Sequence, residues 1–167
     1  MSQDFYLGNP NLKKVGTEIQ FTKEQIQEYL RCKEDPVYFA MNYIKIISLD
    51  EGIVPFKMWD FQQELIESFH ENRFNIAKLP RQTGKSTTCV SYLLHYILFN
   101  DNVNVGILAN KLSTARDLLG RLQLAYEQLP LWLQQGIVVY NKGSMELENG
   151  SKILAASTSA SAVRGMS

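Results

Sequence analysis

Apolar residues change spacing repeatedly along the second half of the chain, and the change predicts strands connected by helices. Residues 74–79 and 103–109 are short apolar runs typical of strands, and residues 85–99 between them have apolar side chains at helical spacing. Ser113 is placed to cap a further amphipathic helix. Strands that alternate with helices form parallel units with right-handed crossovers. The sequence therefore predicts an α/β fold with a parallel-sheet core.

The first half of the chain has helical spacing with clear start signals. Thr22 and Gln25 match a capping box, and Asp35 with Pro36 supplies an N-cap and a first-turn proline. The predicted elements are a flexible arm over residues 1–20, helices over 23–33 and from 36 onward, a strand near 53–56 and a helix over 60–70.

Toward its end the chain returns to strand spacing. The pattern predicts a short helix over residues 129–135 and strands at 137–140, 145–148 and 152–156, followed by a loop over 157–161. Asn149-Gly150 separates the last two strands, and this dipeptide favours a tight hairpin. We therefore expect a β-hairpin in addition to the parallel units.

Size and composition indicate an ordinary globular protein. A chain of 167 residues with 45% hydrophobic and 20% charged residues suits one compact domain and excludes wholesale disorder. Seventeen basic residues balance seventeen acidic ones, which argues against a protein dedicated to coating nucleic acid but leaves a local basic site open.

The compartment follows from the cysteines and from the lengths of the apolar runs. Cys32 and Cys89 are far apart and have no Cys or His at metal-binding spacing, so we expect free thiols in a reducing compartment. The run from Cys89 to Phe99, interrupted by His95, is too short for a membrane span, and the N-terminus is polar. We expect a cytoplasmic protein that does not bind a membrane.

A candidate phosphate site falls where the first parallel strand would turn into its helix. Its sequence is Pro80-Arg81-Gln82-Thr83-Gly84-Lys85-Ser86-Thr87. In this context backbone N–H groups, including those of Thr83 and Gly84, can surround a polyphosphate. Lys85 can neutralise the outer charge of the phosphate, and the Ser86 hydroxyl can bind Mg²⁺. The usual P-loop (Walker A) spacing places a further glycine five positions before Gly84, where this chain has Leu79.

The two cations of this segment favour a bound anion. An ammonium at a helix N-terminus, as expected for Lys85, is unfavourable to the helix dipole unless an anion binds there. Arg81 lies in the same loop, and two positive side chains this close repel each other until a polyphosphate binds. Arg81 is thus a candidate phosphate sensor or arginine finger, with a local carboxylate as the alternative partner.

Two further features bear on nucleotide chemistry. Gln62 follows Phe61 in the segment Trp59-Asp60-Phe61-Gln62, and a glutamine amide can pair with adenine while an adjacent aromatic ring stacks on it. No predicted core strand ends in an acidic residue that could hold Mg²⁺. We expect Glu146 and Glu148 to face solvent from a hairpin strand.

Several of these segments together resemble the N-terminal ATPase of the large terminase subunit of T-even-like tailed bacteriophages. The resemblance covers the chain from about residue 8 to the end. Its segments are residues 78–87, Phe61-Gln62, residues 105–109 with Lys111, residues 129–138, 141–144 and 148–151, and Ala162-Val163-Arg164-Gly165. That family also has a deviant phosphate loop with an arginine at the position of Arg81. The resemblance implies a P-loop ATPase of the ASCE (RecA-like) type.

The resemblance implies that ATP and Mg²⁺ are the cofactors, with the family's lysine at Lys85 and its hydroxyl ligand at Ser86. Its adenine-binding pair falls on Phe61 and Gln62, while Pro80, Gln82, Thr83 and Thr87 complete the loop. The implied partner is double-stranded DNA, packaged into a procapsid together with a portal protein and a small terminase subunit. The implied compartment is the cytoplasm of the infected host cell.

The family's Mg²⁺-binding aspartate, catalytic glutamate, coupling motif and nuclease domain would all follow Ser167. We therefore expect residues 21–167 to be the N-terminal part of an ATPase domain that is truncated before the Walker B strand. On its own this part is expected to be inactive, and the missing C-terminal segment is an expected partner. Two alternatives remain: part of a RecA-like helicase, or a non-catalytic nucleotide-binding module that needs a partner chain.

Overall fold

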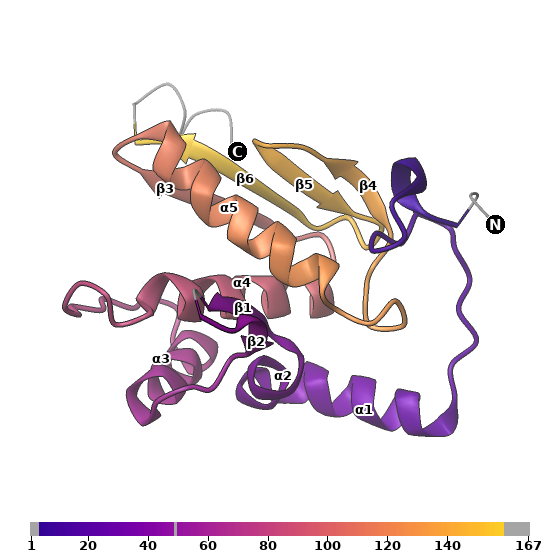
Figure 1. Ribbon diagram of the computed structural model, residues 1–167, viewed down its shortest axis with the longest axis horizontal. Helices are drawn as coiled ribbons and strands as arrows, with labels where there is room; N and C mark the ends of the chain where they lie inside the picture. Colours follow the sequence, from indigo (N-terminus) through magenta and orange to yellow (C-terminus); the bar gives the residue numbers. More distant parts are fainter. Residues whose placement is uncertain (1–3, 49, 159–167) are drawn as a thin grey trace.

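The computed structural model describes residues 4–48 and 50–158, and within them it is a mixed α/β structure (Figure 1). The helices are η1 (Tyr6–Gly8), α1 (Lys23–Glu34), α2 (Pro36–Tyr43), α3 (Asp60–Glu71), α4 (Lys85–Phe99) and α5 (Leu112–Glu127). The strands are β1 (Lys45–Ser48), β2 (Gly52–Pro55), β3 (Asn104–Ala109), β4 (Ile137–Tyr140), β5 (Ser144–Leu147) and β6 (Lys152–Ser157).

The larger sheet is mixed, with strand order β3-β6-β5-β4. β3 and β6 are parallel, whereas β6, β5 and β4 are successively antiparallel. The predicted hairpin between β5 and β6 is confirmed, and its Gly150 has a φ of 79°, a backbone conformation that suits glycine. The parallel part of the described sheet is thus limited to one pair of strands.

The helices form layers on one side of this sheet. α5 packs along β3 and β6, α4 packs against α5, and α2 and α3 pack against α4 (Figure 1). Side chains of α4 such as Leu94, Ile97 and Leu98 are buried in the centre of the core. α4 is therefore held on two sides, and its N-terminus has a fixed position relative to α3.

The predicted helix starts in the first half of the chain are confirmed. The Thr22 hydroxyl accepts from Gln25 N at 3.2 Å, and the Gln25 side chain accepts from Thr22 N at 3.0 Å, which forms the capping box of α1. The Asp35 carboxylate accepts from Tyr38 N at 2.8 Å and caps α2, whose first residue is Pro36.

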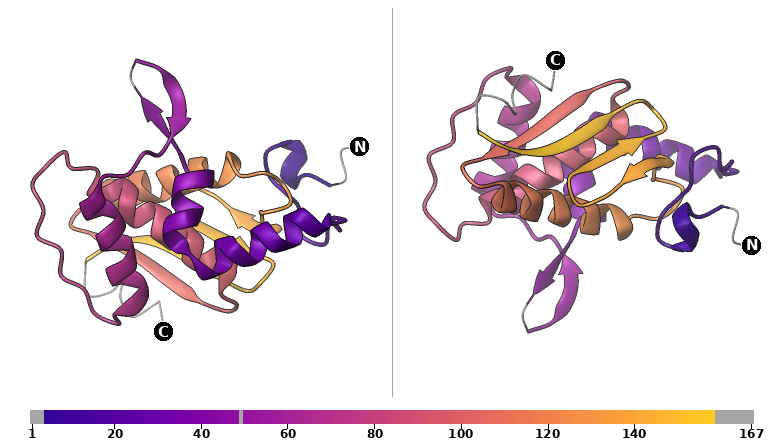
Figure 2. Two further views of the ribbon diagram at one scale, coloured as in Figure 1. Left: turned by 90° about the horizontal axis from the view of Figure 1, so that it is seen from below. Right: turned by 90° about the horizontal axis from the view of Figure 1, so that it is seen from above.

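β1 and β2 form a separate antiparallel hairpin that projects from the helical layers (Figure 2). β2 corresponds to the strand predicted near residues 53–56, but β1 was not predicted. Ile47 and Ile53 face each other across the two strands and are 63% and 52% exposed. Alternating apolar and polar residues mark a strand that buries one face, and this hairpin buries little of either face. The spacing of apolar residues therefore gave no signal for β1.

Residues 74–79 form no strand, so that prediction is wrong. They run in an extended path between α3 and α4, at the left edge of Figure 1, with the side chains of Phe74 and Ile76 exposed. A strand is stabilised by a neighbour that pairs with its backbone N–H and C=O groups. β3 hydrogen-bonds to β6 and not to this segment, which therefore has the composition of a strand without a described partner.

Two smaller predictions are also wrong. Residues 129–135 form a turn rather than a helix, with Leu133 N donating to Pro130 O at 2.9 Å. α5 begins one residue before Ser113, and its N-cap residue Lys111 makes no side-chain capping hydrogen bond. The core contacts of α5 along the sheet decide where the helix starts, because a cap contributes only about 1 kcal/mol.

The first residues of the chain, expected to form a flexible arm, pack against the sheet in the part that the structure describes. Leu12 is 3% exposed, and Ile137 N at the start of β4 donates to Lys13 O at 2.8 Å. The Gln134 side chain accepts from Lys13 N and donates to Asn11 O, at 3.0 and 2.9 Å. Backbone groups of the arm are thus satisfied by the edge of the sheet.

Among the described residues, no helix is long and apolar enough to cross a membrane.

Candidate functional site

The loop that precedes α4, residues 80–84, makes a tight turn at the N-terminus of this 15-residue helix. Gln82 and Gly84 both have left-handed backbone conformations, with φ of 63° and 73°. Gly84 is the residue before the helix and adopts this conformation at no steric cost, whereas Gln82 is less favourable there. Strained residues of this kind persist where the surrounding structure holds them, and they are common at ligand sites.

Lys85, the first residue of α4, folds back over the loop. Its Nζ atom donates to Pro80 O at 3.0 Å and lies 3.5 Å from Leu79 O. The Thr83 hydroxyl donates to the same Pro80 oxygen at 3.1 Å. Within the described residues the ammonium is therefore held over the loop by carbonyl groups, and a phosphate oxygen would be a stronger partner for it.

The first turn of α4 is tied down by hydroxyl groups. Thr88 is fully buried, and its hydroxyl donates to Gly84 O at 3.2 Å, while the Ser91 hydroxyl donates to Thr87 O at 2.8 Å. Ser86 differs, because its half-buried hydroxyl makes no hydrogen bond within the described residues. That hydroxyl is accordingly available to a ligand or a metal ion.

Gln62 connects the start of α3 to the loop. Its side chain is 4% exposed, with Oε1 accepting from Trp59 N at 3.0 Å and Nε2 donating to Thr83 O at 3.1 Å. The sequence analysis assigned Gln62 and the loop to one site, and in the structure the two are in direct contact. Both ends of the amide are engaged within the protein.

A hollow of about 250 Å³ lies beside the loop. It is lined by Ile46 of β1, by Phe56, Lys57, Trp59 and Gln62, and by Gln82, Thr83, Gly84 and Thr87. Phe61 does not line it. That ring faces a second hollow, between α3 and residues 74–79, and its centroid is 5.7 Å from that of Trp59. Trp59 is therefore the aromatic residue on the loop side of α3.

The charges around the first hollow are positive. Lys57 lines it, and Arg81 is exposed on the loop, with neither side chain paired to a carboxylate within the described residues. No described aspartate or glutamate lines the hollow. The local carboxylate considered as a partner of Arg81 is thus not found in the part of the chain that the structure covers. Such a surface attracts an anion.

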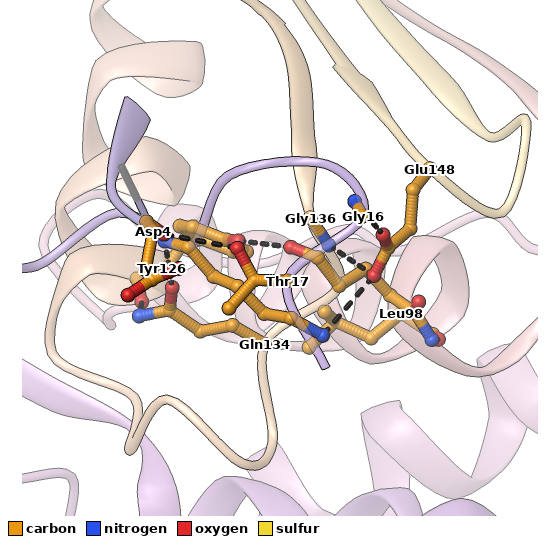
Figure 3. Close-up of polar contacts among 10 residues, drawn as sticks. Asp4, Gly16, Thr17, Leu98, Tyr126, Gln134, Gly136 and Glu148 are labelled. Atoms are coloured by element: carbon orange, nitrogen blue, oxygen red, sulfur yellow. Dashed lines mark hydrogen bonds and ion pairs between the residues drawn. The ribbon is translucent and has the colours of Figure 1, made fainter. Parts of the chain in front are cut away.

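Glu148 was expected to face solvent, but it forms the centre of a polar cluster on the opposite part of the molecule, here called the Glu148 corner (Figure 3). Its carboxylate accepts from Gly136 N at 2.6 Å, from Gly16 N at 3.2 Å and from Lys13 Nζ at 3.2 Å. Partial burial acts to raise the pKa of the Glu148 carboxyl, but these donors outweigh it and hold the pKa below its usual value. Glu148 fastens the N-terminal arm and is not near the loop.

His95 is a buried histidine whose protonation the fold also affects. It lies on α4 at 2% exposure, with Nε2 hydrogen-bonded to Cys32 O at 2.9 Å and Nδ1 without a partner in the described structure. Burial lowers the pKa of His95 to about 4, so the ring is neutral at pH 7. No described group of three or more His, Cys, Asp or Glu residues could hold a metal ion.

The chain matches no protein-family model. Of the segments that carry the resemblance to terminases, Ala162-Val163-Arg164-Gly165 lies outside the described residues. The structure brings together Gln62 and the loop residues Pro80, Arg81, Gln82, Thr83, Gly84, Lys85, Ser86 and Thr87. Three residues that the sequence did not assign to the site, Trp59, Lys57 and Ile46, line the hollow beside the loop. Phe61, which the sequence did assign to it, lines the second hollow instead. The sequence shows that a tryptophan precedes Phe61, but it does not show which of the two aromatic side chains lies on the loop side of α3.

Proposed function

We propose that the chain binds a nucleoside triphosphate, with the phosphates on loop 80–84 and the base in the adjacent hollow. The observation that carries the proposal is the position of Lys85. Its ammonium lies inside a left-handed turn at a helix N-terminus, where it has only carbonyl partners and no described carboxylate. A cation in this position suits a polyphosphate.

Mg²⁺ fits the same site through Ser86. The hydroxyl is free within the described residues and lies next to Lys85 at the start of α4. Mg²⁺ in nucleotide sites is bound mainly by phosphate oxygens, water and one or two protein oxygens, so it does not require a cage of acidic side chains. When bound, the ion would neutralise phosphate charge, and Arg81 would add a second positive group to the outer phosphate.

We further propose that the nucleotide is ATP and that the chain is the N-terminal part of a DNA-packaging motor of the large terminase class. This proposal rests on the resemblance described above. The partner on which such a motor acts is double-stranded DNA. No observation favours a RecA-like helicase over a terminase.

Hydrolysis needs an acidic residue that activates water, and the hollow offers none among the described residues. We propose that a further polypeptide segment supplies it by adding a strand beside β3. The outer edge of β3 is unpaired within the described sheet, Leu108 on this strand is 42% exposed, and the apolar residues Phe74 and Ile76 lie exposed on the segment leading to the loop. Unpaired edges with exposed apolar side chains are sites of strand addition.

Titration with a fluorescent ATP analogue in the presence of Mg²⁺ tests the nucleotide proposal. Lys85→Ala should lower affinity by about 100-fold or more, because a charge-assisted contact to phosphate is lost, while the fold stays intact. Lys33→Ala on α1 is the matched control, since it removes the same charge from an exposed position away from the loop. Equal affinity in folded Lys85→Ala would disprove the assignment of the loop.

A further inference from the structure

The two ends of the Gln62 amide are already used inside the protein. Oε1 accepts from Trp59 N at 3.0 Å, Nε2 donates to Thr83 O at 3.1 Å, and 4% of the side chain is exposed. A glutamine that reads a base must present an acceptor and a donor together to the edge of that base. Gln62 could do so only by breaking the contacts that hold α3 and the loop in place.

The backbone of the loop lies directly against this amide. A Cβ atom built on Gly84 would be 2.6 Å from Gln62 Nε2, so the close approach depends on glycine at this position. The contact lies between the left-handed residues Gln82 and Gly84. Gln62 is therefore placed to fix the shape of the turn that would hold phosphate.

The base-facing surface of the hollow is aromatic rather than polar. Trp59 is 62% exposed and lines the hollow together with the loop, while Phe61 lines a different hollow. The backbone N–H of Trp59 is the group that Gln62 holds. An exposed indole ring can stack on any nucleobase, because every base has a π-face.

We propose that Gln62 is a positioning residue, which couples Trp59 to the phosphate loop without reading the base, and that Trp59 binds the base by stacking. The proposal rests on the nucleotide site proposed above. It assigns affinity for the base to Trp59 and affinity for phosphate to the loop that Gln62 braces. The site then has little selectivity between ATP and GTP.

The test compares three probes in the presence of Mg²⁺: inorganic triphosphate, ATP and GTP. Gln62→Met, which keeps the length of the side chain and removes its hydrogen bonds, should weaken all three about ten-fold. Trp59→Leu should weaken ATP and GTP about ten-fold and leave triphosphate unchanged. Gln63→Met is the matched control on the same helix and should change none of them.

Gln62→Met also leaves Trp59 N and Thr83 O without their side-chain partner, so its unfolding temperature should fall, and binding is measured well below that temperature, where the variant is folded. Binding of all three probes that returns to the affinity of the unchanged chain under these conditions would show a purely structural role and would overturn the proposal. Loss of ATP affinity alone, with GTP and triphosphate unaffected, would show that Gln62 reads adenine and would overturn the proposal. Unchanged nucleotide affinity in Trp59→Leu would overturn the stacking role.

The unchanged chain gives an independent measurement. Its affinities for ATP and GTP should agree within about three-fold, because stacking does not distinguish base edges. A ten-fold or larger preference for ATP would contradict the proposal even if every variant failed to fold. Failure of the unchanged chain to bind triphosphate at all would instead remove the proposed phosphate site, and with it the role of Gln62.

Discussion

The Glu148 corner and loop 80–84 are both polar, but their polar groups are satisfied in opposite ways. At the corner, a carboxylate meets two backbone N–H groups and one ammonium, all from the same protein. At the loop, the Lys85 ammonium has only carbonyl partners, and the exposed Arg81 has no carboxylate partner among the described residues. The first region is satisfied within the chain, and we propose that the second is completed by an anion.

The difference separates polar groups that hold the fold from polar groups that serve a ligand. Removing one member of a satisfied cluster leaves other buried groups unpaired, so the stability of the folded state falls. Removing the Lys85 ammonium frees only two loop carbonyl oxygens, Pro80 O and Leu79 O, and opens no cavity in the core, so stability should change little. Changes at the two regions should therefore affect different measurements.

The largest effect is expected at the corner. Glu148→Ala should lower the free energy of unfolding by about 3 kcal/mol, because Gly136 N and Lys13 lose a charged acceptor. Chemical denaturation measures the change. Glu146→Ala is the control: its ion pair with Lys152 involves a side chain that is 48% exposed, and the expected loss is below about 1 kcal/mol.

The corner also predicts a pH dependence. Because the pKa of the Glu148 carboxyl is lowered in the folded state, its contribution to stability is present above the ordinary pKa of 4.5 and is lost as the pH falls through the folded pKa. The N-terminal arm should loosen over the same range, as amide hydrogen exchange of residues 13–16 would show. Arm protection that is independent of both pH and Glu148 would contradict the role of the corner.

His95 sharpens the comparison, because it is buried and its Nδ1 atom has no hydrogen-bond partner among the described residues. Its pKa is about 4 in the folded state against 6.5 normally, so unfolding takes up a proton between these values. Stability should fall by about 2 kcal/mol between pH 7 and pH 5 on this account. His95→Gln should remove that part of the pH dependence, and an unchanged profile would show that another group causes it.

The smallest expected effect is at Gly84. Replacement by alanine should cost about 1 kcal/mol for the left-handed backbone, and it should also weaken triphosphate binding because the new Cβ displaces Gln62. Gly120→Ala in α5, where a Cβ meets open space, is the matched control and should stabilise the helix by about 0.5–1 kcal/mol. Tight triphosphate binding by Gly84→Ala would show that the turn is not shaped by Gln62.

Local signals predicted several helix starts correctly. The capping residues Thr22 and Asp35 mark helix starts that the structure confirms, because a cap acts on the N–H groups of its own helix. The start of α4 at Lys85 also followed from the sequence. These features depend on residues close together in the chain.

Features that depend on distant residues were harder to predict. Residues 74–79 and β3 have similar apolar composition, but only β3 has a described strand beside it. Two of the three donors to Glu148, Lys13 Nζ and Gly16 N, lie more than a hundred positions away in the chain. The side of α3 on which Trp59 lies depends on how α3 packs. The loop residues could be assigned to one site because they are contiguous in the sequence. Trp59 and Lys57 could be assigned to it only after the fold was known.

Thermal unfolding with and without Mg²⁺ and ATP tests the separation of the two regions most directly. Without ATP, Lys85→Ala should melt at the same temperature as the unchanged chain, and Glu148→Ala should melt about 6–12 °C lower. ATP at ten times its dissociation constant should raise the melting temperature of the unchanged chain and of Glu148→Ala by about 3–6 °C, and that of Lys85→Ala not at all. Equal stabilisation of Lys85→Ala by ATP would contradict the account.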